Sequence, residues 1–147
     1  MEQLERLSNA SRECIGEAVY QGAGFVADKV KEATRALPID ERHVKDGQML
    51  NGITRKQKAG LLDGFGIAPL RDDNDYLNVK LGFAGYNSVK TKTFPNGQPN
   101  AVIARSVNSG TSFRQRIPFV DDTVRQAKKA CEEKMKDTIE NEIKKVM

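Results

Sequence analysis

The sequence predicts an α+β fold: a small, mostly antiparallel sheet packed by a long N-terminal helix, a short middle helix and a long C-terminal helix. Apolar residues recur at gaps of three and four near both ends of the chain, which is typical of amphipathic helices. Residues 76–83 alternate strictly between apolar and polar, which is typical of a half-buried strand. A length of 147 residues suits one domain, 1–147, with its core over 54–147.

The first expected helix runs from about Gln3 to Ala36 and ends before Pro38. Gly22 and Gly24 interrupt it, and each costs up to about 1 kcal/mol relative to alanine. Two explanations stand open: the glycines kink the helix, or they let another backbone approach closely. Either way, we expect residues 1–37 to form a mobile or docking element.

A polar loop, 38–52, separates this helix from the short middle helix. Thr54 and Gln57 form a capping-box pattern, in which each side chain bonds the free backbone N–H of the other residue. Leu61 is an apolar anchor of the helix, and Gly64 is expected to end it.

The strand Tyr76–Phe83 is the clearest in the sequence, with Ile67–Leu70 as its expected partner. Residues 71–75 would form the hairpin turn, and Lys80 would offset the aspartates in it. A cation site is the alternative for these aspartates, but their spacing lacks the glycine and distal glutamate of an EF-hand. A solvated turn is therefore the prediction. One face of the strand is apolar: Leu77, Val79, Leu81 and Phe83.

The next segment, 84–98, is too polar for a core and too long for a tight turn. It interleaves two aromatic and two basic side chains: Tyr86, Lys90, Lys92 and Phe94. Such a mixture suits a protein interface, which we expect here. Two alternatives are nucleic-acid stacking and a merely flexible connection.

An apolar helical piece, 101–104, follows, and a Ser-Gly-Thr-Ser turn ends it. The last helix is expected over 118–146, because Pro118 suits a helix start and an apolar stripe continues from there. Phe119, in the first turn, is predicted to be a structural anchor folded over the apolar face of the strand. The stripe has gaps of three and four: Val120, Val124, Ala127, Cys131, Met135, Ile139, Ile143 and Val146.

The order of these pieces resembles that in the small tail-component and tail-completion proteins of long-tailed bacteriophages and prophages. These include head–tail joining proteins and tail terminator-like proteins. The likeness covers about 54–130 and rests on the middle helix, the strands, and the motifs Gly85-Tyr86-Asn87, Ser109-Gly110-Thr111 and Pro118-Phe119-Val120. It implies a ring of identical subunits, with six as the leading expectation. Expected partners are tail-tube or head–tail connector proteins. Expected locations are the host cytoplasm during assembly and then the tail or neck of the virion.

In such a ring, Arg105, Arg114 and Arg116 are expected to line the lumen or to pair with an adjacent subunit. The net charge of +4 lies mainly between residues 41 and 116, which is a mild bias. A dedicated DNA binder carries a denser basic stripe, so we expect at most weak, nonspecific DNA contact. A small basic nucleic-acid-binding or packaging-associated module is the alternative function.

The sequence gives little reason to expect catalysis, a metal or a cofactor. His43 is the single histidine, and no Cys-x-x-Cys spacing occurs. We expect Cys14 and Cys131 to be reduced core thiols. The N-terminus is acidic and polar, and no apolar run approaches the roughly 20 residues of a membrane span, so neither a secretory signal nor a membrane contact is expected.

Overall fold

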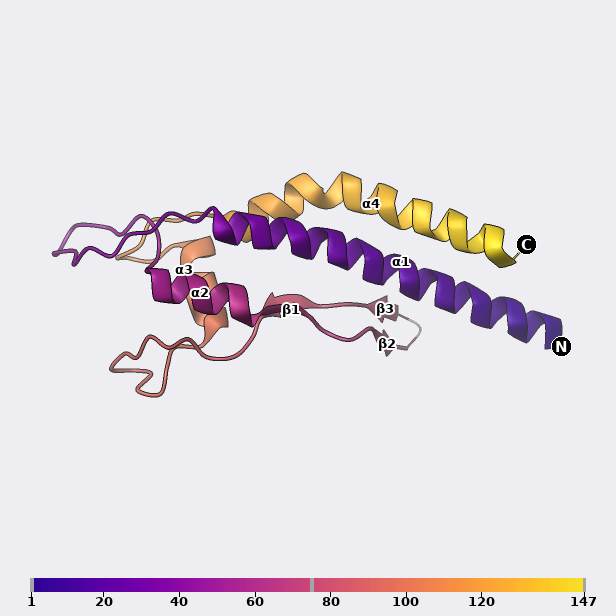
Figure 1. Ribbon diagram of the computed structural model, residues 1–147, viewed down its shortest axis with the longest axis horizontal. Coiled ribbons are helices and arrows are strands. Elements are labelled where there is room, and N and C mark those ends of the chain that lie inside the picture. The colour runs from indigo at the N-terminus through magenta and orange to yellow at the C-terminus, as the bar shows by residue number, and fades with distance from the viewer. Residues whose placement is uncertain (1, 75, 147) are drawn as a thin grey trace.

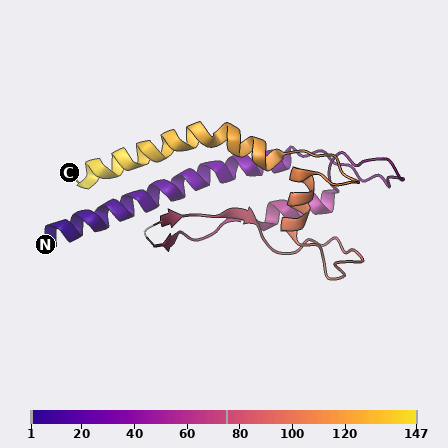
Figure 2. The ribbon, with the colours of Figure 1, turned by 180° about the vertical axis from the view of Figure 1, so that it is seen from behind.

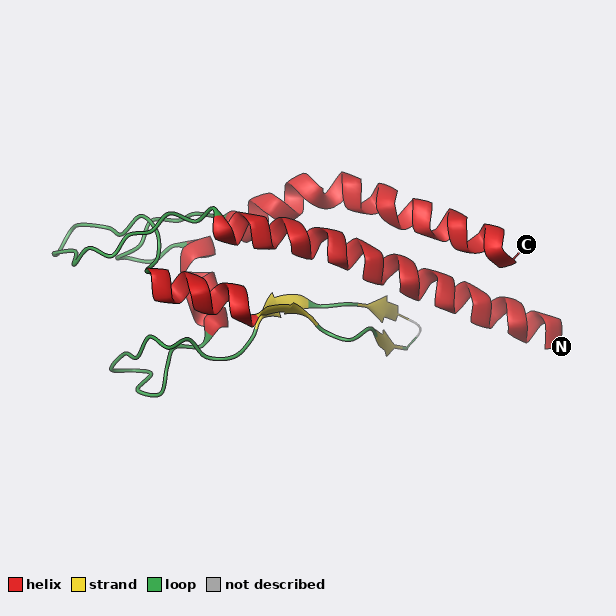
Figure 3. Cartoon of the chain, in the orientation of Figure 1, coloured by secondary structure: helices red, strands yellow, loops and turns green. Residues whose placement is uncertain are grey.

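The computed structural model describes residues 2–74 and 76–146, except for the side chains of residues 2–4, 7, 8 and 146. The described chain forms four helices and two small antiparallel sheets, which confirms the predicted α+β class (Figure 3). The helices are α1 (Glu2–Arg35), α2 (Arg55–Gly64), α3 (Asn100–Ser109) and α4 (Phe119–Val146). The strands are β1 (Phe65–Ile67), β2 (Arg71–Asp73), β3 (Tyr76–Asn78) and β4 (Leu81–Phe83).

Helices α1 and α4 form an antiparallel pair along the molecule, with α2, α3 and the strands on one side of it (Figures 1 and 2). Both predicted thiols lie at their contact. Cys14 Sγ lies 3.6 Å from the carbonyl oxygen of Ile139, and Cys131 Sγ lies 3.5 Å from that of Gly22. Cys14 is buried, as expected of a core thiol, whereas Cys131 is half-buried. The long N-terminal helix is thus packed along α4.

The two glycines of α1 differ in what surrounds them. A Cβ on Gly22 would lie 2.7 Å from Met135 Cγ and 3.1 Å from Cys131 Sγ on α4. A Cβ on Gly24 would meet nothing within 4 Å. The nearest neighbours of Gly22 are thus side chains of α4 instead of the other backbone that one of the two explanations expects, and Gly24 has no packing reason.

Helix α2 begins and ends for reasons that the sequence shows directly. The capping box is present: Thr54 Oγ1 accepts from Gln57 N at 3.1 Å, and Gln57 Oε1 accepts from Thr54 N at 3.0 Å. Leu61 is fully buried, and the helix ends at Gly64, where the chain turns into β1.

The predicted single strand 76–83 is wrong, because the structure divides it into β3 and β4. Strand β1 pairs with β4, with Phe65 opposite Phe83. Strand β2 pairs with β3, with Arg71 opposite Asn78. The register shifts by one residue between the two ladders, so Pro69 and Leu70 together lie opposite Val79. This is the arrangement of a β-bulge, and proline, which has no N–H to donate, suits it.

The predicted partner strand 67–70 and turn 71–75 change accordingly. The hairpin runs from Phe65 to Phe83, with residues 71–73 inside a strand and Asn74 at the tip in the left-handed region (φ 54°). Asp75 lies outside the described residues. The aspartates are met by arginines instead of Lys80: Arg12 on α1 bonds Asp72, and Arg71 bonds Asp73.

The core lies at the end of the molecule where α1 finishes and α2, α3 and α4 meet. Its buried members come from five segments: Leu37, Ile53, Leu61, Ile103, Ala104, Val107 and Phe119. Phe119 is 6% exposed, and its ring centroid lies 6.1 Å from that of Phe83. It is therefore a core residue, as predicted, although only Phe83 of the expected apolar strand face packs against this cluster.

Helix α4 begins on a cap that another helix provides. Pro118 contributes only its carbonyl, which accepts from Asp122 N at 2.8 Å. Asn108, near the end of α3, accepts from both Val120 N and Asp121 N at 3.1 Å through its Oδ1. These two N–H groups have no partner inside the helix, so the amide of Asn108 does the work of an N-cap.

We expect Gly24→Ala to raise the free energy of unfolding by up to about 1 kcal/mol, because alanine favours the helix and the added methyl group meets open space. Gly22→Ala gains the same helix preference but forces Met135 to move, which costs about 1–3 kcal/mol as overpacking does elsewhere. Urea unfolding of the matched pair measures the difference. Equal effects of the two substitutions would contradict the close packing of α4 on Gly22.

Phe119→Ala should lower the free energy of unfolding by about 3–5 kcal/mol, through lost burial and an unfilled cavity. Because a domain of this size has only about 5–15 kcal/mol in total, the melting temperature should fall sharply. Phe113→Ala, at an aromatic residue that is half exposed, is the control and should change the melting temperature much less. Similar losses in both variants would argue against Phe119 as the anchor.

Candidate protein interface

The 84–98 loop is held to the body by two buried asparagines that no local sequence pattern marks. Asn87 Nδ2 donates to the carbonyl of Gln57 at 3.1 Å and to Asn100 Oδ1 at 3.2 Å. Asn100 Nδ2 donates to the carbonyl of Ala84 at 2.9 Å. Because both amides are buried, each of these bonds replaces a bond to water that would otherwise be lost.

Two glycines of α2 make room for this anchor. A Cβ on Gly60 would lie 2.1 Å from Asn87 Nδ2, and one on Gly64 would lie 2.4 Å from the carbonyl oxygen of Ala84. The glycines are four residues apart and therefore share one face of the helix. A glycine pair at this spacing in a short polar helix is the sequence signal that a backbone or side chain packs closely there.

The loop has its own backbone hydrogen bonds, so it is a folded excursion from the body (Figure 1). Gln98 N donates to the carbonyl of Val89 at 2.9 Å, and Thr91 N donates to that of Phe94 at 3.0 Å. Gly97 adopts φ 117°, where a Cβ would meet the carbonyl oxygen of Asn87 at 2.2 Å. The segment therefore has hydrogen bonds of its own in addition to the asparagine anchor.

Three of the four predicted interface residues are exposed. Tyr86 is 74% exposed, the highest value among the large apolar side chains described, and Lys90 and Lys92 are also exposed. Phe94 is half-buried, and its carbonyl accepts from two residues of the same loop. Tyr86, Lys90 and Lys92 are thus free to meet a partner, whereas Phe94 also supports the loop itself.

The three predicted lumen arginines have different surroundings. Arg105 is exposed on α3. Arg116 is exposed, pairs with Asp121 of the same chain at 3.9 Å and donates to the carbonyl of Asn108 at 3.3 Å. Arg114 is only 6% exposed, so its assignment to a lumen surface needs correction.

Arg114 is a buried cation held by neutral groups. Its Nη1 donates to Ser106 Oγ at 2.9 Å, and its guanidinium lies 5.7 Å from the Phe113 ring centroid. Burial lowers the pKa of Arg114 from its ordinary value. The residues on either side of Arg114 tie two loops together, because Leu50 N donates to the carbonyl of Phe113 and Gln115 N donates to that of Leu50, both at 2.8 Å. Its role in the structure is to join segments.

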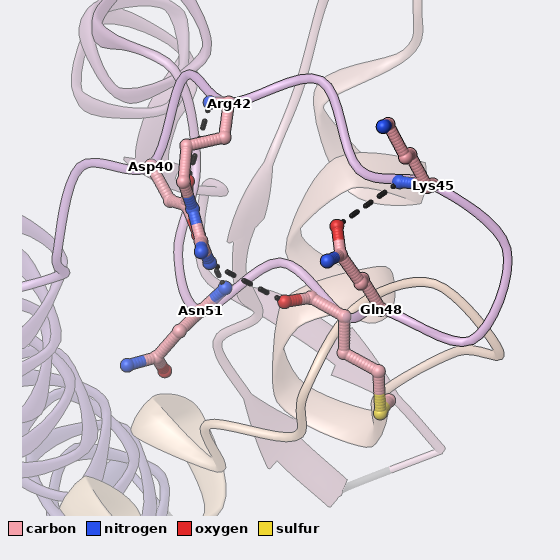
Figure 4. A network of polar contacts seen from close by, with 6 residues as sticks. Asp40, Arg42, Lys45, Gln48 and Asn51 are labelled. Atoms are coloured by element: carbon pink, nitrogen blue, oxygen red, sulfur yellow. Dashed lines mark hydrogen bonds and ion pairs between the residues drawn. The ribbon is translucent and has the colours of Figure 1, made fainter.

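The 38–52 loop, expected to be exposed and polar, is organised around a buried carboxylate. Asp40 accepts from Arg42 Nε and Nη2, both at 2.8 Å, and from Asn51 N at 2.8 Å (Figure 4). Across the loop, Gln48 Oε1 accepts from Lys45 N at 3.2 Å. The Arg42 guanidinium, followed by the Asn51 N–H, holds the pKa of Asp40 well below its usual range. Polar composition predicted the loop, but not this internal ion pair.

A second exposed apolar area, also missed from the sequence, lies where the 38–52 loop meets the segment after α3. Met49 is 41% exposed and Phe113 is 50% exposed, and the backbone bond from Leu50 to Phe113 brings them close. Ile39, which forms an isolated parallel bridge with Ile53, is 40% exposed. These residues give the loop end of the molecule apolar contact surface of its own.

Reactive chemistry is sparse in the part of the chain that the structure describes. No group of three or more histidine, cysteine, aspartate or glutamate residues is arranged to hold a metal ion there. Burial, and then the nearby Glu132, raises the pKa of Cys131, which disfavours the reactive thiolate. Among the described helices, none combines the length and the apolar character that crossing a bilayer requires.

Comparisons of the chain with protein-family models, with curated proteins and with solved structures found no match.

We expect Asp40 to make folding depend on pH. Because the folded-state pKa of Asp40 is depressed, its stabilisation is complete above the unfolded-state value near pH 4 and is lost as the pH falls below it. Asp40→Asn should therefore reduce the free energy of unfolding at pH 7 and reduce it less at pH 3. Urea unfolding of both proteins at the two pH values measures this. A stability difference that stays constant between pH 7 and pH 3 would contradict the assignment.

Proposed function

We propose that this chain is a structural protein of bacteriophage tail assembly, a component of a head–tail joining or tail-completion ring that acts through protein–protein contacts. The observation that carries the proposal is the surface of the isolated chain. Its accessible area is 10331 Å². A compact monomer of 16.3 kDa is expected to expose only about 7,500 Å².

The excess, about 2,800 Å², falls within the about 2,000–5,000 Å² that obligate interfaces bury. It arises because the main buried cluster lies at one end, while the helix pair and the β-hairpin extend from it and bury mostly small side chains such as Ala18, Ala27 and Ala127 (Figure 1). A shape of this kind leaves large apolar side chains exposed, and contact with neighbouring subunits would cover them.

Exposed apolar side chains are spread over several elements, as expected of a subunit with more than one neighbour. They occur on α1, on the hairpin, on the 84–98 loop, on α3 and at the loop end: Ile15, Tyr20, Leu70, Tyr76, Tyr86, Val102, Met49 and Phe113. A head-to-tail ring uses two different surfaces of each subunit and leaves neither open. A ring of six remains the leading expectation from the family resemblance.

In this proposal the 84–98 loop contacts a neighbouring subunit or the tail tube through Tyr86, Lys90 and Lys92. The hydrogen bonds of Asn87 and Asn100 anchor the base of the loop, and such anchoring reduces the ordering entropy lost on binding. The chain would work in the host cytoplasm during assembly and then in the tail or neck of the virion.

The alternative of a nucleic-acid-binding or packaging-associated module has less support. It needs the basic residues free on one face, but Arg114 is buried and Arg116 pairs with Asp121. Arg105 remains exposed and is compatible with weak contact to DNA passing through a lumen.

The test is incorporation into particles. The chain, mixed with the tail-tube protein of the same phage, should form a ring that light scattering and negative-stain imaging detect. Tyr86→Ser combined with Lys90→Ser and Lys92→Ser should fold normally but reduce incorporation at least tenfold, because the exposed contacts are lost. Lys128→Ser combined with Lys129→Ser, at exposed lysines of α4 outside the proposed contacts, is the control and should incorporate like the parent.

A chain that stays monomeric with tails present would contradict the ring, and normal incorporation of the triple variant would remove the 84–98 loop as the contact. Duplex binding tighter than about 10⁻⁴–10⁻⁶ M at physiological salt would favour the nucleic-acid-binding alternative instead.

A further inference from the structure

The base of the β-hairpin has backbone groups that nothing in the described chain satisfies. Ala84 N donates to the carbonyl of Gly64, and Ala68 N donates to that of Lys80, both at 2.8 Å. In an antiparallel ladder, hydrogen-bonded pairs alternate with non-bonded pairs, so Gly66 with Gly82 is the bonded pair between them.

It follows that Ile67 on β1, and Leu81 and Phe83 on β4, direct their backbone N–H and C=O groups away from the hairpin. No hydrogen bond to these groups occurs within residues 2–74 and 76–146. The pairing of Phe65 with Phe83 at a non-bonded position agrees with the 5.0 Å between their ring centroids. Both strands of this two-stranded sheet are therefore open edges.

The side chains do not protect these edges. Phe65, Ile67, Leu81 and Phe83 share the inner face, toward the helices, and all are half-buried. The outer face carries Gly66 and Gly82, which are exposed and where a Cβ would meet nothing within 4 Å. Natural proteins usually protect an exposed strand edge with charged residues, proline or a bulge. Here the bulge at Pro69 and the charge of Lys80 both lie outside the β1–β4 ladder.

Open space flanks β4 on two sides. A groove of about 350 Å³ separates it from α3 and α4 and is lined by Arg105, Val120 and Val124. A shallow hollow of about 340 Å³ lies over the glycine face. No described strand pairs with either edge of this sheet, and an isolated two-stranded hairpin is only marginally stable in water.

We propose that β4 of one copy pairs with β1 of a second copy, so that the hairpins of neighbouring subunits continue one antiparallel sheet. The inference rests on the proposed ring and names its contact. A second copy fits because the two edges match. On β4, Leu81 and Phe83 present unpaired backbone N–H and C=O groups two residues apart. On β1, Ile67 and the carbonyl of Phe65 present such groups at the same spacing. Hairpins repeated side by side keep every neighbouring pair antiparallel.

This pairing uses two different edges of each subunit, so it is a head-to-tail contact that closes only in a ring. In the matched register, Gly82 of one copy lies opposite Gly66 of the next at a non-bonded position. The Cα atoms of such a pair are about 4.5 Å apart, which is within the range that a disulfide spans.

The test is disulfide formation between singly substituted chains. Gly66→Cys and Gly82→Cys are made separately in a Cys14→Ser, Cys131→Ser background, and folding is checked by circular dichroism. Each is oxidised alone and as an equal mixture, over a concentration series and with the tail-tube protein of the same phage. A cross-linked dimer should form in the mixture and not in either variant alone. Ala59→Cys, exposed on α2, mixed with Gly82→Cys is the control and should stay uncross-linked.

The outcomes separate the pairing from the ring itself. Rings that form without the Gly66–Gly82 cross-link would overturn the edge pairing and leave the ring intact. Cross-linking of Gly82→Cys with itself would replace the head-to-tail pairing by a two-fold one. Monomers throughout the series and with the tail-tube protein would overturn both the ring and the pairing.

Discussion

The buried cluster at one end of the molecule is the constraint on which the rest of the structure depends. Leu37 follows α1, Ile53 precedes α2, Leu61 lies on α2, and Ile103 and Phe119 lie on α3 and α4. No two of these segments bury much apolar surface alone, because each presents one or two large side chains. The cluster forms only when all of them meet, so it fixes where the helix pair and the β-hairpin depart from the body.

Concentrating the core at one end leaves the remainder of the chain dependent on weaker contacts. The far parts of α1 and α4 touch through small or flexible side chains such as Gly22, Cys131 and Met135. The hairpin tip reaches α1 through the exposed Arg12–Asp72 pair and the approach of Leu70 to Gly16. An exposed ion pair adds at most about 1 kcal/mol, so these extensions are the parts that neighbouring subunits would stabilise most.

The elements that follow a local rule could be predicted from the sequence. Periodicity placed the long helices, and the Thr54–Gln57 pattern placed the start of α2, because both depend on neighbours a few residues apart. Alternation alone did not reveal the break in the strand, which depends on Pro69 in the opposite arm of the hairpin. The burial of Arg114 and Asp40 also escaped prediction. Each depends on a partner in the folded structure: Ser106 and Leu50 for the arginine, and Asn51 for the aspartate.

The cap that Asn108 gives to α4 links two helices that share few other contacts. Val120 and Asp121 lose their acceptor whenever the last turn of α3 opens, since Asn108 moves with that turn. Local opening in a protein usually proceeds in contiguous units, and this bond makes the end of α3 and the start of α4 one such unit, although ten residues separate Asn108 from the first residue of α4. The first turn of α4 is thus ordered by α3, which precedes it in the chain. During synthesis, α3 would form first and would then offer Asn108 as the cap at which α4 begins.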